Sequence, residues 1–142
     1  MQITKIFTFD SGHRLSNYQG KCKRLHGHTY RLEITVQGDL DNKGMVMDFG
    51  DLKTIFKEHI DGKFDHRIML MKGDKLNEAI AKVLPVGDES ICWVDYNPTA
   101  ENIAKDIMKI LQENIDNQIN NIKTTKVKLY ETPTSFAEMS SK

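Results

Sequence analysis

The sequence lacks an excess of charge of either sign and any long apolar run, and both absences limit what the protein can bind. Lys plus Arg and Asp plus Glu number 20 each, so the formal net charge is zero. Without a large basic excess to neutralise phosphates, we do not expect nucleic acid as the main partner. No apolar stretch is long enough to cross a membrane, so we do not expect a membrane partner either.

Cysteine is also scarce, with only Cys22 and Cys92 present and far apart in the chain. The first ten residues alternate polar and apolar side chains, unlike the continuous apolar stretch of a signal peptide. Without an export signal, two distant cysteines are expected as reduced thiols rather than as a disulfide. We therefore predict a cytoplasmic protein, whose 142 residues, 39% of them hydrophobic, suffice for one domain with a real core.

The segment from Cys22 to His28 is the richest in candidate metal ligands. His26 and His28 begin a stretch that alternates apolar and polar residues up to residue 37, which predicts a half-buried strand. Residues two apart in a strand share a face, so the two imidazoles point the same way, and Gly27 between them allows close approach of a ligand. Two such imidazoles are two thirds of an open zinc site, with His13 as the third candidate. A lone His-x-His pair is equally typical of two surface histidines.

Hydrophobic alternation predicts further strands at 2–9, 90–96, 124–132 and 136–139, with Ser11-Gly12 breaking or bulging the first of them. We expect Cys92 and Trp93 to be packing residues. In the strand at 124–132, Val127, Leu129 and Glu131 share one face. If that face is buried, Glu131 is a carboxylate aimed into the protein, which is costly without a partner. Either the strand ends before residue 131 or Glu131 has a designated partner.

Helical spacing of apolar residues predicts a helix at 48–60 with Asp48 as N-cap, and a long helix that starts at the N-cap Thr99. The long helix should bury Ile103, Ile107, Ile110, Leu111 and Ile115. A shorter helix is expected at 74–84, with Leu76, Ile80, Val83 and Leu84 directed inward. The order of elements predicts an α+β domain over residues 1–142, with an antiparallel sheet and helices on one face. A helix and a strand at about 67–96 form an inserted segment.

Two further groups of polar residues are candidates for function. Asp65-His66 could form a proton relay in which the carboxylate orients the imidazole, although sequence neighbours do not automatically hydrogen-bond. The stretch 14–24 contains Arg14, Lys21, Lys23 and Arg24. These residues are typical of a solvated loop, or of a clamp for an anionic substrate.

Several of these pieces occur together and in a fixed order. The combination resembles the 6-pyruvoyl-tetrahydropterin synthase / 6-carboxytetrahydropterin synthase family over nearly the whole chain. The three residues between Cys22 and His26 are similar to the spacing in bacterial 6-carboxytetrahydropterin synthases of the queuosine pathway. The segment between His66 and Asn97 is longer than in the compact members of that group. The resemblance is carried by residues 9–15, Cys22 with His26-Gly27-His28, Met47-Asp48-Phe49, Asp65-His66, 97–102 and Glu131-Thr132.

The resemblance implies a tunnelling fold (T-fold), in which a four-stranded antiparallel sheet carries two main helices on one face and several sheets assemble into an oligomeric barrel. A homo-oligomer, either a trimer or a hexamer, is implied with it. It further implies that His13, His26 and His28 hold Zn²⁺. Cys22 is implied as the base, Asp65 and His66 as a relay completed across a subunit interface, and Glu131 as the pterin anchor. Contacts to the substrate are expected from Thr99, Lys21 and Arg24.

The implied reaction is the conversion of 7,8-dihydroneopterin triphosphate to 6-carboxy-5,6,7,8-tetrahydropterin, with release of acetaldehyde and triphosphate. Two alternatives stay open. The protein could instead eliminate triphosphate to form 6-pyruvoyl-tetrahydropterin. Cys22 and the three histidines could also form a closed four-ligand zinc site, which is typical of a structural rather than a catalytic metal.

Overall fold

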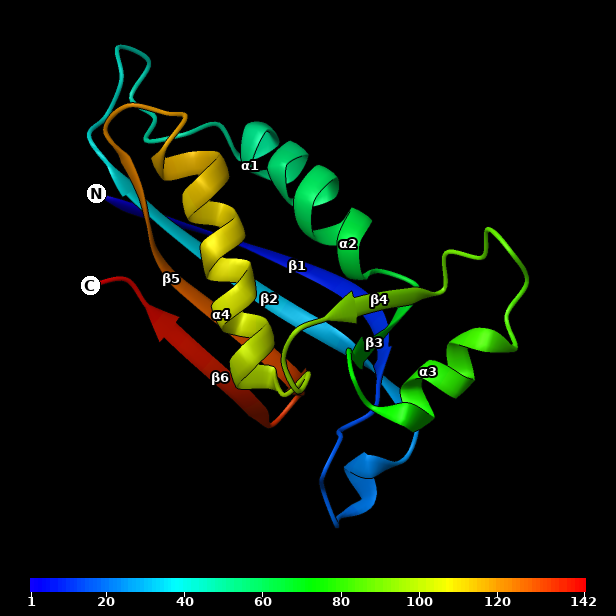
Figure 1. Ribbon diagram of the computed structural model, residues 1–142. Coiled ribbons are helices and arrows are strands. Elements are labelled where there is room, and N and C mark those ends of the chain that lie inside the picture. Colours follow the sequence, from blue (N-terminus) through cyan, green and yellow to red (C-terminus); the bar gives the residue numbers. More distant parts are fainter.

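Two long strands form the centre of the sheet in the computed structural model, which describes residues 1–142 (Figure 1). β1 (Gln2–His13) and β2 (His26–Gly38) pair antiparallel along their whole lengths, from Gln2 opposite Gln37 to His13 opposite His26. The expected break at Ser11-Gly12 was wrong, because both residues stay in register with β2. Gly12 lies against the neighbouring strand, where a Cβ atom would be 3.2 Å from the side chain of Ile68.

The sheet has six strands in the order β4-β3-β1-β2-β5-β6. β5 (Ile122–Thr132) and β6 (Ser135–Ser140) pair antiparallel beside β2, so these two strands with β1 and β2 make the predicted antiparallel sheet. On the other side, β3 (Arg67–Met71) runs parallel to β1, and β4 (Ile91–Val94) runs parallel to β3. The sequence analysis missed β3. The inserted segment therefore adds two strands, and the sheet is mixed rather than purely antiparallel.

The helices lie on one face of the sheet, as predicted (Figure 1). α1 (Phe49–Phe56) begins where the Asp48 carboxylate accepts a hydrogen bond from the Gly50 N–H, and a π-helical turn at Lys57–Asp61 joins it to α2 (Gly62–Phe64). α4 (Ala100–Leu111) begins where the Thr99 hydroxyl accepts from the Asn102 N–H, and it continues in a π-helical turn at Gln112–Asp116. Both predicted N-caps are confirmed. No helix is both long and apolar enough to cross a membrane.

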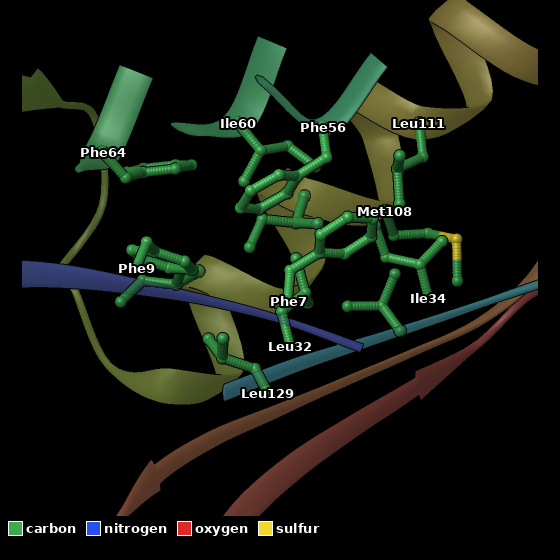
Figure 2. Close-up of a cluster of buried hydrophobic side chains, with 14 of the residues drawn as sticks. Phe7, Phe9, Leu32, Ile34, Phe56, Ile60, Phe64, Met108, Leu111 and Leu129 are labelled. Atoms are coloured by element: carbon green, nitrogen blue, oxygen red, sulfur yellow. The ribbon is translucent and has the colours of Figure 1, made fainter. Parts of the chain in front are cut away.

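The core fills the space between the sheet and these helices. Odd-numbered residues of β1 and even-numbered residues of β2 face inward. Figure 2 shows Phe7 from β1 meeting Phe56 from α1; their rings stack with centroids 4.1 Å apart and planes 10° apart. Such an aromatic pair adds about 0.5–1.5 kcal/mol beyond the burial of its area. The residues predicted to be buried in the long helix are buried in α4 and the π-helical turn that follows it, except for Ile110, which is partly buried.

α3 (Lys75–Lys82), in the inserted segment, presents a face that differs from the predicted one. Leu76 is 53% exposed and Val83 is 82% exposed, whereas Asn77 is completely buried. The polar residues Asp74 and Asn77 face the protein because both bind Arg14. Trp93, expected as a packing residue, is 36% exposed, and its neighbour Cys92 is buried as predicted.

Candidate active site

Three histidines meet at the end of the β1–β2 pair. His13 is the last residue of β1 and lies opposite His26, and His28 lies on the same face of β2 as His26. One ring nitrogen from each histidine can be chosen so that all three lie within 4.8 Å of one another. Their ring centroids are 4.6 to 5.1 Å apart. The strand register thus brings together the three residues predicted as zinc ligands.

Hydrogen bonds to the backbone fix which nitrogen carries the proton in two of the three rings, those of His13 and His26. His13 Nδ1 lies 2.7 Å from the carbonyl oxygen of Pro98, and His26 Nδ1 lies 2.6 Å from that of Arg24. A carbonyl can only accept, so both Nδ1 atoms donate and both Nε2 atoms present a lone pair. Backbone carbonyls orient metal-binding imidazoles in the same way.

The lone pairs of His13 and His26 face each other. Their Nε2 atoms are 3.1 Å apart, and in this tautomer neither can donate to the other. Nε2 of His28 is buried and has no hydrogen-bond partner. Burial lowers the pKa of both His13 and His28, which favours their neutral forms. Neutral imidazoles that converge on one point are the donor set that zinc prefers, so the residues present fit the expected metal.

Glu131 lies beside the histidines. β5 extends through Thr132, and Glu131 is the residue left unpaired at an irregularity in the β5–β6 pairing between Tyr130 and Thr132. Its Oε1 atom is 3.7 Å from Nε2 of His28, and its side chain is 23% exposed. β5 therefore does not end before residue 131, and the Glu131 carboxylate lies near His28.

A cavity of about 300 Å³ adjoins Glu131. Thr99 and Glu101, at the N-terminus of α4, line it together with Ser135, and five apolar residues complete the lining. Sequence reasoning named Thr99 and Glu131 as substrate contacts but did not assemble the rest of this wall, because its residues come from separate elements. The lining includes Leu15, Tyr18, Thr99, Glu101, Glu131 and Phe136.

Cys22 lies outside the histidine cluster. It sits in a 3₁₀ turn, Lys21–Lys23, of which no residue is buried, and its thiol is free. The group of possible metal ligands contains the three histidines and not Cys22. Lys21 and Arg24 are exposed in the same loop. Arg14, which the sequence grouped with them, instead donates from Nη1 to Asp74 and Asn77.

Asp65 and His66 do form the hydrogen bond that their sequence only suggested. His66 Nδ1 donates to Asp65 Oδ2 at 2.6 Å, and the Asp10 N–H donates to Asp65 Oδ1 at 2.9 Å. His66 adopts a left-handed conformation, with φ of 57°, because its own N–H turns back to the Asp10 carbonyl.

The charges of this pair shift both of its pKa values. The hydrogen bond that His66 donates to Asp65, together with the charge of that carboxylate, raises the pKa of His66. Burial of the Asp65 carboxylate acts to raise its pKa. The hydrogen bonds donated by the Asp10 N–H and by His66 outweigh burial, so the pKa of Asp65 is lowered overall. The imidazole of His66 is 79% exposed and opens into a separate hollow of about 510 Å³, which His28 also lines. Within one chain, His66 of the Asp65–His66 pair therefore opens into a different cavity from the one beside Glu131.

Residues 2–142 match the model of one protein family, described as 6-pyruvoyl tetrahydropterin synthase. The chain belongs to this family. A relative from Rickettsia bellii, named 6-carboxy-5,6,7,8-tetrahydropterin synthase, is 39% identical over 141 residues, which cover 98% of this chain and 99% of the relative. A relative of the same name from Haemophilus influenzae is 38% identical, with 96% of each chain covered.

Solved structures of the family have the same fold. An uncharacterized protein from Wolinella succinogenes is 27% identical and superimposes with a TM-score of 0.83, over 100% of this chain and 98% of that one. The 6-pyruvoyl tetrahydropterin synthase of Caenorhabditis elegans is 23% identical, with a TM-score of 0.73 over 100% and 96% of the two chains, and shows the fold alone. The predicted family and T-fold are confirmed, and so is the prediction of an enzyme of the lyase class.

Proposed function

We propose that this enzyme converts 7,8-dihydroneopterin triphosphate and water to 6-carboxy-5,6,7,8-tetrahydropterin, acetaldehyde and triphosphate, a reaction of queuosine biosynthesis. The observation that supports this most directly is the placement of Glu131, which lies between three convergent imidazoles and a cavity of about 300 Å³. A flat heterocycle in that cavity would direct its side chain toward the histidines. Relatives named for the 6-carboxy product add support.

His13, His26 and His28 would hold the zinc ion in this proposal. Three protein ligands leave a coordination position open, as in catalytic zinc sites. A zinc ion there would act as a Lewis acid on the oxygens of the substrate side chain. Pro98 and Arg24 contribute by fixing the tautomers of two of the three rings through their carbonyls.

Glu131 would anchor the pterin ring. A carboxylate can accept two parallel hydrogen bonds, here from a ring N–H and the exocyclic amine, and that geometry is specific for the orientation of the ring. Thr99, at the N-terminus of α4, would contact the same ring, since it lines the same cavity. Leu15, Tyr18 and Phe136 provide apolar surface for the ring faces. A cavity lined mainly by apolar groups with a few polar ones is typical of small-molecule sites.

Cys22 would remove the proton from the side-chain carbon of the substrate, acting in its thiolate form. Asp65 and His66 would hold and return protons, with the carboxylate fixing Nδ1 as the donor and leaving Nε2 free to exchange. The exposure of His66 suits a relay that reaches the site of a neighbouring copy in a homo-oligomer, either a trimer or a hexamer. Lys21 and Arg24 would hold the triphosphate.

Product analysis tests the proposal. The zinc-loaded protein would be given 7,8-dihydroneopterin triphosphate, with products identified by mass spectrometry and acetaldehyde assayed in parallel. Formation of the 6-carboxy product with one acetaldehyde per turnover supports the proposal. A 6-pyruvoyl product without acetaldehyde would assign the other reaction of the family to the same residues. No turnover by zinc-loaded protein would overturn the substrate assignment.

A further inference from the structure

The inserted segment is joined to the loop between β1 and β2 by a compact set of hydrogen bonds, and Figure 1 shows α3 beside that loop. Asp74, the N-cap of α3, accepts from the Ser16 hydroxyl at 2.6 Å and from Arg14 Nη1 at 2.9 Å, both at Oδ2. Asn77, one turn into the helix, accepts from Arg14 Nη1 at 3.0 Å. Two residues of α3 therefore hold two residues of the loop.

These two α3 residues are themselves firmly held. Asp74 uses its other oxygen, Oδ1, to accept from the Leu76 and Asn77 N–H groups, which fixes the carboxylate at the helix start. Asn77 is completely buried, and its Nδ2 donates to the Met71 carbonyl at the end of β3. Hydrogen bonds from Ser16 and Arg14 hold the pKa of Asp74 at about 2, so the carboxylate is charged at neutral pH.

Ser16 is the most constrained residue of the loop. It is 1% exposed, and its backbone N–H and carbonyl both bind the side chain of Asn97, at 2.8 and 3.0 Å. Its hydroxyl binds Asp74. All of its polar groups are thus satisfied by residues of two other segments, which makes it a fixed point in the chain.

Cys22 depends on this fixed point for its position. The 3₁₀ turn that carries it has no buried residue, so packing does not place it. Its carbonyl accepts a hydrogen bond from the Leu15 N–H at 3.0 Å, and Leu15 lies between the two anchored residues, Arg14 and Ser16. A shift of Arg14 or Ser16 would therefore move Leu15, and with it the turn that carries Cys22.

We propose that Asp74 and Asn77 are positioning residues for Cys22: the inserted segment fixes Arg14 and Ser16, and these fix the turn through Leu15. The inference rests on the proposed function, in which Cys22 is the base. It gives the inserted segment, residues 67–96, a role in the reaction. Because Leu15 also lines the cavity beside Glu131, the same anchor sets the distance between the base and the bound ring.

The two cysteines of the chain allow a test that needs no substrate. Cys22 lies in the anchored loop, and Cys92 is buried in β4 of the inserted segment, at 6% exposure. Alkylation by iodoacetamide, followed by mass spectrometry of each peptide, reports on the loop and on the integrity of the segment separately. The variants are Asp74→Asn and Ser16→Ala, the second of which removes one hydroxyl and leaves the helix cap in place. Glu78→Gln, exposed on α3, is the matched control.

The expected result is alkylation of Cys22 that is about tenfold faster in both variants, since an anchoring hydrogen bond to a charged group is lost, while Cys92 stays protected. The kcat value on the pterin substrate should fall about tenfold or more, because small displacements of a reacting group are costly. Unchanged alkylation of Cys22 would overturn the inference. Simultaneous exposure of Cys92 would also overturn it, since the network would then only stabilise the segment. A wild-type protein without turnover would refute the proposed function but leave the alkylation result readable.

Discussion

His13 and His26 face each other across the β1–β2 pair with their Nε2 atoms 3.1 Å apart, while the Nδ1 atom of each ring is bound to a backbone carbonyl. Two acceptors at this distance repel unless a cation lies between them or one ring takes a second proton. Burial lowers the pKa of His13 and so opposes the second proton. The pair is therefore best satisfied by a metal ion, and His28 supplies a third nitrogen.

Replacing His26 should abolish this metal binding. We expect the wild type to bind zinc stoichiometrically and His26→Ala to bind little, measured by elemental analysis after dialysis. A ligand that binds only the folded state at one hundred times its Kd adds about 2.7 kcal/mol of stability. The wild type should therefore gain roughly 10 °C in Tm with zinc, and His26→Ala should not. His59→Ala is the control, since His59 lies on the π-helical turn after α1, outside the cluster. An equal zinc-dependent gain in Tm for His26→Ala and His59→Ala would contradict the assignment of His26 as a metal ligand.

Replacing Cys22 separates a base from a metal ligand. Because the thiol is outside the histidine cluster, Cys22→Ala should keep its zinc and its zinc-dependent gain in Tm. Turnover should fall by about 10²–10⁴-fold, the range expected for loss of a general base. Steady-state kinetics and metal analysis on the same preparation measure both effects. Loss of zinc from Cys22→Ala would instead indicate a closed site with four ligands.

Much of this arrangement is predictable from local patterns. The alternation after His28 gave the strand and its buried face, and that face then placed His26 and His28 together. Asp48 and Thr99 have side chains that can cap, so the helix starts could be read directly. Glu131 was recognisable because a carboxylate on an apolar face needs a partner, and the structure places it 3.7 Å from His28.

The features that sequence reasoning missed depend on contacts between distant segments. In α3 the apolar spacing predicted Leu76 as buried, but Asp74 and Asn77 bind Arg14, some sixty residues earlier, and turn the polar face inward. β3 is only five residues long and has no alternation of polar and apolar residues, because side chains on both of its faces are at least partly buried. The wall of the cavity beside Glu131 is assembled from the β1–β2 loop, α4 and β6, so no single stretch of sequence reveals it.

Replacing Glu131 by glutamine should weaken substrate binding more than it weakens the fold. The amide keeps the shape but can accept only through one atom, and it places an N–H against a donor of the ring. Hydrogen bonds to charged groups contribute about 1.5–3 kcal/mol, so kcat/KM should fall by roughly 10–150-fold. Glu138→Gln on β6, whose carboxylate lies 3.5 Å from Lys126 on the surface, is the control and should retain activity. Equal activity of Glu131→Gln and wild type would refute the anchoring role.

The Asp65–His66 ion pair should make the stability of the fold depend on pH, because the pKa values of its two members shift in opposite directions. The raised pKa of His66 means that its contribution to stability is complete below the ordinary value of 6.5 and is lost as the pH rises through the raised value. The lowered pKa of Asp65 means that its contribution is complete above the ordinary value of 3.8 and is lost as the pH falls through the lowered value. The ion pair is therefore fully formed between about pH 3.8 and 6.5.

Asp65→Asn tests this coupling at His66 itself. In the wild type, the Cε1 proton of His66 should titrate with a midpoint above 6.5, followed by NMR. In Asp65→Asn the midpoint should fall back toward 6.5, because the neutral amide no longer favours the imidazolium. If the relay operates in turnover, the basic limb of the kcat/KM profile should move to lower pH with the His66 midpoint. A profile that stays in place while the midpoint moves would exclude His66 as the proton donor.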